Sequence, residues 1–438
     1  MTARPGRVLT AVAVACACAV VLAGCAGSQP PNSAAGPAAA TEPSRAAAPR
    51  PGAVPVRRGA TAPAGTQAPG PVATTPSGRD VSPSQVPVAA AGPAAFCAAA
   101  PLGRLTRALA SAVPGSAAAA LVPLGAAPDG RTGYVAAWTH GFAGVAALNL
   151  GTGRLRAISA FPDPAADQAD GASAGRWLVW TQTTSVTDLD SFTVDAWDAV
   201  TGRVRVLGHS LTGPDGTPWP SPWHAPAVSG HYAAGAQGYG QGGLVEIELA
   251  DLDTGAVVTV RRGHVQAPFL DGQLVVWPES DRPGSETSLR AYSLLTRAPA
   301  ALPAVLAPVQ GTDFVVTDGH RTAYLSPDFT RLLYSPAQDQ PARTVLALPA
   351  GNDFTDLAIA PGVLAWSTTT ATFLASTSTG AYAQVTPRYG YPTGSGSVML
   401  ISDAPARQSA HPPLPTHVVH PAALTWPACP PVPQTTGP

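Results

Sequence analysis

The stretch that decides the fold is YVAAWTHGFAGVAALNLGTGRLRAIS, residues 134–159. It contains three short segments of β-strand character, at residues 134–138, 145–150 and 154–159. Thr152-Gly153 separates the last two, and a glycine there supplies the positive φ of a tight hairpin turn, whose backbone the preceding Asn149 can bond. The stretch therefore predicts a meander of antiparallel strands.

The same unit recurs along the chain. Trp138, Trp180, Trp277 and Trp366 stand 42, 97 and 89 residues apart, which is one unit and then two pairs of units. A period of about 45 residues is typical of propeller blades. We predict an all-β propeller with seven blades, with six blades and a decorated end as the alternative count. The further copies cover residues 177–207, 232–260, 273–294, 314–348, 363–385 and 398–424.

A short helix is predicted before the first unit. Leu102, Leu105, Leu109 and Val113 share one face at helical spacing, and Pro114-Gly115 ends the run. We expect this helix, residues 102–113, to pack against one mouth of the propeller.

Two turns carry a family resemblance. Ala127-Pro128-Asp129-Gly130 and Ser326-Pro327-Asp328 resemble the Ser-Pro-Asp-Gly turns of TolB-like propellers, with Phe329 standing where the second turn would have glycine. The resemblance implies a propeller that serves as a binding platform, which is an analogy from fold.

The amino-terminal sequence has the three parts of a bacterial export signal. Arg4 and Arg7 precede an apolar run at residues 8–21, and Leu22-Ala23-Gly24-Cys25 follows. A retained membrane helix is the alternative, but it needs roughly 20 continuous apolar residues. The motif resembles the lipobox of bacterial lipoproteins, which implies that residues 1–24 are removed and that Cys25 carries diacylglycerol and a fatty acid such as palmitate. We expect a lipid anchor on the extracytoplasmic face of the cell membrane.

Composition divides the mature chain into a tether and a domain. Residues 25–93 are rich in Ala, Pro and Gly and contain no aromatic residue, so they lack the apolar area for a core and are expected to be disordered. All 27 aromatic side chains follow residue 95, nine each of Trp, Tyr and Phe. We place the propeller at residues 94–429 and a disordered tail at 430–438.

The cysteines fit an exported protein. Cys16 and Cys18 leave with the signal peptide and Cys25 is lipidated, so Cys97 and Cys429 remain. Because disulfides persist in oxidising compartments, we predict that these two pair and join the ends of the domain. The alternative is two separate thiols.

Several motifs resemble chemical sites without the context that such sites need. The 25 basic residues are all arginine and the net charge is −1, so no nucleic-acid partner is expected. Gly171-Ala172-Ser173-Ala174-Gly175 matches a hydrolase elbow, but a polar loop is expected before it and a strand after it. Gly238, Gly240 and Gly243 join two expected strands instead of opening a helix. The nine histidines are scattered, so we expect neither a metal nor a cofactor.

One aromatic loop is a candidate binding surface. Pro218-Trp219-Pro220-Ser221-Pro222-Trp223-His224 holds two indoles between prolines, and rigid aromatic faces contribute contact area at low entropic cost. We predict that Trp219, Trp223, His224 and Tyr239 bind an envelope protein, peptide or glycan, unless the indoles only cover the domain's own surface. The chain is thus interpreted as a binding or scaffolding module of the cell envelope. The alternative is a lyase or hydrolase whose carboxylates, histidines and arginines meet in the propeller channel.

Overall fold

Antiparallel strands dominate the part of the chain that the computed structural model describes. The described residues are 84–85, 96–98, 109, 112–164, 168–183, 191–219, 225–240, 243–312, 314–349, 352–404 and 414–429. They belong to one compact unit. Within them the structure has 29 strands and two 3₁₀ turns, Ser116–Ala118 and Pro421–Ala423. The predicted all-β fold is confirmed.

The strands follow one another in groups of three or four. The first group is β3 (Ala120–Ala126), β4 (Thr132–Trp138), β5 (Ala143–Asn149) and β6 (Leu155–Ala160). The second is β7 (Gln168–Ala174), β8 (Trp177–Thr183), β9 (Phe192–Asp198) and β10 (Val204–His209). The third is β11 (Ala227–Ser229), β12 (Tyr232–Gly238), β13 (Val245–Asp251) and β14 (Val257–Val265). The fourth is β15 (Phe269–Asp271), β16 (Leu274–Ser280), β17 (Ser288–Ser293) and β18 (Ala298–Ala300).

The remaining groups continue the order. The fifth is β19 (Val315–Thr317), β20 (Thr322–Leu325), β21 (Arg331–Ser335) and β22 (Arg343–Ala347). The sixth is β23 (Phe354–Ala360), β24 (Val363–Thr368), β25 (Thr372–Ser376) and β26 (Ala381–Thr386). The seventh is β27 (Gly390–Ser395), β28 (Val398–Asp403) and β29 (Thr416–Val419).

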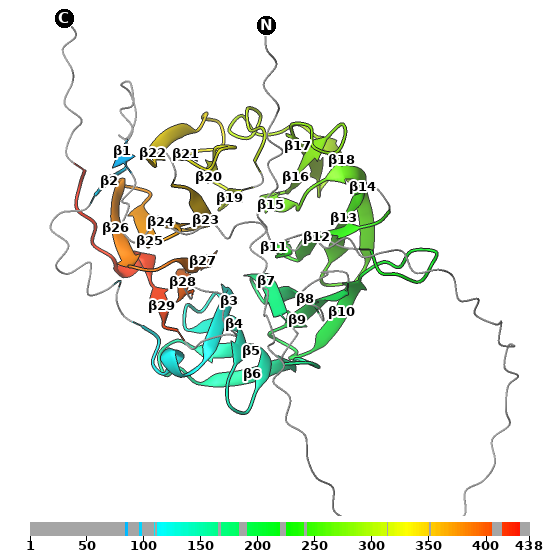
Figure 1. The fold of residues 1–438 in the computed structure, drawn as a ribbon, viewed down its shortest axis with the longest axis horizontal. Helices are drawn as coiled ribbons and strands as arrows, with labels where there is room; N and C mark the ends of the chain where they lie inside the picture. Colours follow the sequence, from blue (N-terminus) through cyan, green and yellow to red (C-terminus); the bar gives the residue numbers. More distant parts are fainter. Residues whose placement is uncertain are drawn as a thin grey trace, which may run out of the picture. The chain divides into compact units, whose positions relative to one another are not determined.

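These groups are arranged around a common centre as the blades of a β-propeller. Figure 1 shows the first strand of each group, β3, β7, β11, β15, β19, β23 and β27, nearest the centre and the later strands farther out. The third and fourth groups form one continuous sheet through the pairing of β14 with β16, so hydrogen bonding alone delimits six sheets in the described residues. The blade count of seven therefore stays a prediction.

The predicted turn chemistry is present at the outer hairpins. Gly153 has a φ of 71° and Gly255 a φ of 79°. Asn149 Oδ1 accepts hydrogen bonds from the backbone N–H groups of Gly151 and Thr152, at 3.1 and 2.9 Å. Asp251 Oδ1 accepts from Asp253 and Thr254 in the same way, at 3.0 Å each. A short polar side chain before the turn thus satisfies the backbone that the hairpin leaves unpaired.

Apolar side chains fill the space between neighbouring groups. Trp180 and Trp366 have no exposed surface. Trp180 belongs to a core with Tyr134 and Trp197, which joins the first and second groups. Burial of such aromatic side chains is the main stabilising contribution to stacked sheets, because a single meander cannot bury both of its faces.

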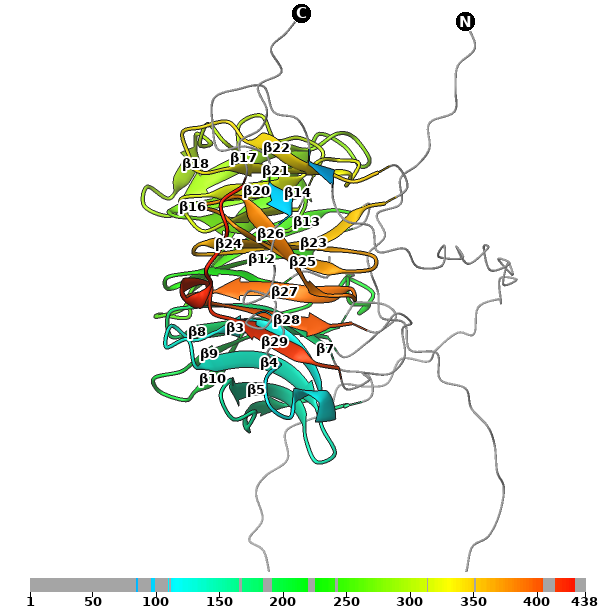
Figure 2. The ribbon, with the colours of Figure 1, turned by 90° about the vertical axis from the view of Figure 1, so that its left-hand side faces the viewer.

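The ring is closed by contacts between the last and the first group. Ser395 Oγ on β27 donates a hydrogen bond to the Ala126 carbonyl on β3, at 2.9 Å. Val398 and Leu400 on β28 pack in one core with Leu121 and Val135. Figure 2 shows β27, β28 and β29 between the strands of the sixth and first groups. The seventh group therefore packs against the first, and the two bury apolar side chains between them.

The amino-terminal segment adds short strands to the outer edges of three consecutive groups. β1 (Ser84–Gln85) pairs antiparallel with β22, and β2 (Cys97–Ala98) pairs parallel with β26, as Figure 1 shows. Ala112 bridges to His417 on β29. The prediction that residues 25–93 form only a disordered tether is therefore wrong at residues 84–85, because an exposed strand edge offers unpaired backbone groups to a passing segment.

The predicted helix at residues 102–113 is wrong at its end. Ala112 lies in a β-bridge, and the Val113 N–H donates to the Thr416 carbonyl at 2.8 Å. Leu109 is helical and is buried in the core between the sixth and seventh groups, not at a mouth of the ring. Pairing with the open edge of β29 gives Ala112 and Val113 partners that a helix end would lack. Residues 102–108 and 110–111 lie outside the described residues.

Candidate binding site

The structure brings together two of the four predicted ligand-binding side chains. The rings of Trp219 and Tyr239 meet edge to face, with centroids 6.3 Å apart and planes at 89°. Both side chains are half-buried. Trp223 and His224 lie outside the described residues.

Backbone hydrogen bonds fix the loop that carries Trp219. The Trp219 N–H donates to the Leu211 carbonyl and the Gly213 N–H to the Thr217 carbonyl, both at 2.8 Å. Asp215 Oδ1 accepts from the Thr217 N–H at 3.1 Å. Because the loop is closed by its own bonds, the backbone that carries the indole is held in place before any ligand arrives.

A charged ladder lies beside the aromatic pair. Gln237, Glu246 and Arg262 face one another across β12, β13 and β14. Glu246 accepts hydrogen bonds from Gln237 Nε2 at 2.8 Å and from Arg262 Nε at 2.7 Å. The Arg262 guanidinium lies 4.8 Å from the centre of the Tyr239 ring. The Glu246 side chain is only 3% exposed, so a cation and two donors compensate its buried charge.

A small pocket adjoins this ladder. It has a volume of about 40 Å³ and lies between strands of the second and third groups. Gln237 and Glu248 line it together with apolar side chains that include Phe192, Val194 and Leu207. Burial, and next the nearby charge of Glu246, raise the pKa of Glu248 to about 7. The pocket therefore contains a carboxyl group that ionises near neutral pH.

Two further carboxyl groups lie on innermost strands. Asp170 is the third residue of β7, and Asp356 is the third residue of β23. Burial raises the pKa of Asp170 to about 6 and that of Asp356 to about 7. The charge of Asp170 also raises the pKa of Asp356, so the two lie within electrostatic range of each other. Both residues keep part of their surface accessible.

These aspartates correct one expectation from the sequence. Residues 163–170 are predicted as a polar loop, yet β7 begins at Gln168 and Asp170 lies inside it. Each carboxylate bonds its own chain, since Asp170 Oδ1 accepts from the Gly171 N–H at 2.9 Å and Asp356 Oδ1 from the Leu357 N–H at 2.8 Å. Neither position carries a motif, so the sequence alone does not identify the two aspartates as a pair.

Ser173 has a structural role in this fold. Its Oγ accepts a hydrogen bond from the Ala126 N–H and lies 2.9 Å from Ser395 Oγ. It stands on β7, which a strand follows and not a helix, so the geometry of a hydrolase elbow is missing. Gly238 and Gly243 flank the hairpin between β12 and β13, where no helix opens toward a phosphate.

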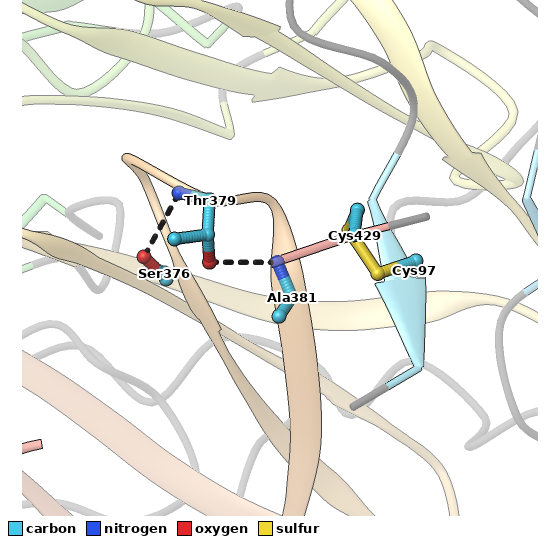
Figure 3. The surroundings of a disulfide bond; sticks show 5 residues. All are labelled: Cys97, Ser376, Thr379, Ala381 and Cys429. Carbon is cyan, nitrogen blue, oxygen red and sulfur yellow. Dashed lines mark hydrogen bonds between the residues drawn. A yellow bond between two sulfur atoms is a disulfide. The ribbon is translucent and has the colours of Figure 1, made fainter. Parts of the chain in front are cut away.

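The Cys97 and Cys429 sulfur atoms are bonded, with Cα atoms 5.8 Å apart, and the two residues are 332 positions apart in sequence. Figure 3 shows the bond beside the β25–β26 hairpin. There the Thr379 N–H donates to Ser376 Oγ at 3.1 Å, and the Ala381 N–H donates to Thr379 Oγ1 at 3.3 Å. Cys25 lies outside the described residues.

The described residues contain neither a cluster of metal-binding side chains nor a membrane-spanning helix. They contain no group of three His, Cys, Asp or Glu side chains that could hold a metal ion. No helix among them has the length and apolar character needed to span a bilayer.

Comparison with known proteins gives structural similarity only. No family model and no curated protein matches the chain. The chain resembles a prolyl endopeptidase at 12% identity and a TM-score of 0.48. The match covers 74% of this chain and 50% of the endopeptidase, so this chain spans about half the length of that enzyme. It resembles oligogalacturonate lyase from Vibrio parahaemolyticus at 10% identity and a TM-score of 0.44, covering 68% of this chain and 91% of the lyase. It resembles TolB from Acinetobacter baumannii at 12% identity and a TM-score of 0.35, and the match covers 68% of this chain and 63% of TolB.

Proposed function

We propose that this chain is a lipid-anchored lipoprotein on the extracytoplasmic face of the cell membrane, and that its propeller is a binding or scaffolding module of the cell envelope. The observation that supports a binding role is the edge-to-face contact of Trp219 with Tyr239 in a loop closed by its own hydrogen bonds. Flat, preorganised aromatic faces suit the apolar face of a sugar ring or an extended peptide.

The anchor is tested by changing Cys25. We expect wild-type chain expressed in bacteria to incorporate radiolabelled palmitate and to sediment with membranes. Cys25→Ala removes the thiol that the lipobox would lipidate, so we expect this variant to incorporate no label. A Cys25→Ala chain that still carries palmitate would contradict the proposed anchor.

The binding surface is tested by sedimentation with purified cell-wall sacculi and by crosslinking in intact cells. We expect Trp219→Ala/Tyr239→Ala to reduce the bound fraction or the crosslinked product about tenfold, since stacking on two aromatic faces contributes roughly 1–3 kcal/mol. The matched control is Tyr389→Ala/Tyr391→Ala, which removes another edge-to-face pair, with centroids 5.0 Å apart. If the Trp219/Tyr239 variant binds as wild type does, or instead loses much of its thermal stability, the indole covers the protein's own surface.

A lyase or hydrolase is the second candidate function. Asp170 and Asp356 favour it, because both lie on innermost strands and both have a pKa raised toward neutrality. Such a pair can supply one protonated and one ionised carboxyl at the same pH. We would test the wild-type chain on chromogenic glycosides and esters. Activity lost in Asp170→Asn and Asp356→Asn but kept in the Trp219/Tyr239 variant would favour this candidate.

A further inference from the structure

The pocket between the second and third strand groups contains an acid without a bonded partner. Among the described residues, none donates a hydrogen bond to the Glu248 carboxylate. Its neighbour Glu246 uses one oxygen for Gln237 and the other for Arg262. Arg262 therefore balances one of two carboxylates, and a negative charge remains on the wall of the pocket whenever Glu248 is ionised.

The other walls of the pocket carry no charge. Thr181, Phe192, Val194, Leu207 and Gly208 come from the second group. A cation in this place would meet one carboxylate, the polar side chains of Thr181 and Gln237, and apolar walls from Phe192, Val194 and Leu207. Such a pocket suits a charged head on a hydrocarbon stem, as on a lysine side chain.

The volume of the pocket and the groups that line it limit which cations can bind there. A single water needs roughly 10–15 Å³ of such space, so the pocket's volume of about 40 Å³ admits an ammonium group and one or two methylenes. Glu248 is the only carboxylate among the lining residues, which gives a metal ion too few ligands. A quaternary ammonium has no N–H group to donate to the Glu248 carboxylate, so it lacks the charge-assisted hydrogen bond that a primary ammonium can make.

We propose that this pocket binds a protonated primary amine on a slim alkyl chain, with the ammonium group on the Glu248 carboxylate and the methylenes between Phe192, Val194 and Leu207. The inference rests on the proposed binding function and names the chemistry of its ligand. A chain of contacts links the pocket to the aromatic pair, because Gln237 lines the pocket and bonds Glu246, and Arg262 bonds Glu246 and lies against the Tyr239 ring.

The pH dependence has a defined sign. Glu248 is mostly neutral at about pH 5.5 and ionised at about pH 8.5, since its pKa is about 7. The charged groups facing it are Glu246 on β13 and Arg262 on β14, and no lining residue from the second group titrates. A primary amine stays protonated across this range. Amine binding should therefore be tighter at the higher pH.

The test is calorimetric titration of the full-length lipidated chain in detergent with propylamine, 1-propanol and tetramethylammonium. We expect saturable binding of propylamine at pH 8.5, at least tenfold weaker binding at pH 5.5, and none of the neutral or the quaternary probe. Glu248→Gln keeps the shape and removes the charge, so it should weaken propylamine binding at least tenfold. Glu286→Gln, which changes an exposed carboxylate elsewhere, should bind as wild type does.

Three results would overturn the proposal. They are no saturable propylamine binding to wild type at pH 8.5, equal binding of tetramethylammonium, and unchanged binding in a folded Glu248→Gln variant. If that variant does not fold, the wild-type pH series still decides, because pH-independent binding excludes Glu248 as the receptor of the charge. Sacculus sedimentation is measured separately, so loss of Trp219-dependent binding and failure of the amine to bind are distinguishable.

Discussion

At the scale of single residues, the ionisable groups with the largest shifts are those that the sequence did not single out. Asp170, Glu248 and Asp356 each sit in a strand among small or apolar neighbours, where a lone carboxylate has no motif. Only the folded structure buries these carboxyl groups, and this burial raises the pKa of each. Trp219 and Tyr239 were predictable, because aromatic residues between prolines and glycines stand out against a polar loop.

Asp356 makes stability depend on pH with a defined sign. Its pKa is about 7 in the folded chain against 3.8 for the ordinary group, so the folded state favours the neutral acid. The stability that this gives is present below about pH 4 and is lost as pH rises through 7. Asp356→Asn stays neutral, so we expect it to exceed wild type at pH 8.5 by on the order of 1–2 kcal/mol and to match it near pH 4.

Urea unfolding at several pH values measures this difference. The control is Asp281→Asn, an exposed carboxylate that should leave the pH profile of the wild type unchanged. Parallel profiles for Asp356→Asn and wild type would show that the carboxyl is not desolvated in the folded chain.

At the scale of the elements, the outer strands were predictable and the innermost strands were not. Crowding near the axis explains the difference. A Cβ atom on Gly171 would meet the Val179 carbonyl oxygen at 2.6 Å, and one on Gly394 the Ile359 carbonyl oxygen at 2.0 Å. Such positions require glycine, a residue with low strand propensity. The packing that makes β7 and β27 innermost thus removes the alternating pattern that identifies a strand.

The disulfide also acts at the scale of the elements, because it holds a short strand in place. β2 pairs with β26 over only two residues, and Cys97 anchors it to the carboxy-terminal segment. Closing so long a loop stabilises a fold by up to about 5 kcal/mol on the chain-entropy model. We expect Cys97→Ser to lower the free energy of unfolding by about 2–5 kcal/mol. Hydrogen exchange should show that the amide of residue 97, which donates to the Gly380 carbonyl, loses its protection.

The central strands of the third group serve as the internal reference in that experiment. β12 and β13 pair over seven residues and are far from the disulfide in the chain, so their amides should stay protected. If instead the amide of residue 97 keeps its protection, backbone pairing alone holds β2 in place.

At the scale of the whole molecule, closure of the ring depends on segments from both ends of the chain. β29 comes from the carboxy-terminal side, and Ala112 and Val113 extend it from the amino-terminal side. The sequence predicted the repeat and the cysteine pair, but not that the amino-terminal segment would pair with three sheets in turn. Pairing of two or three residues has no periodicity to detect, and it is determined by which edges the finished ring leaves open.

Deletion of residues 414–438 tests this closure. It removes β29 and with it two polar contacts, the hydrogen bond from the Val113 N–H to the Thr416 carbonyl and the contact of Ser402 Oγ with Thr416 Oγ1 at 2.7 Å. It also removes the apolar packing of β29 against Met399 and Ile401. Lost backbone pairing and newly exposed apolar surface together should lower the free energy of unfolding by on the order of 5 kcal/mol beyond the loss of the disulfide. The matched control is Cys429→Ser, which lacks the disulfide and keeps β29. If both variants unfold at the same temperature, closure of the ring rests on β27 and β28 against the first group, and the carboxy-terminal strand adds nothing to it.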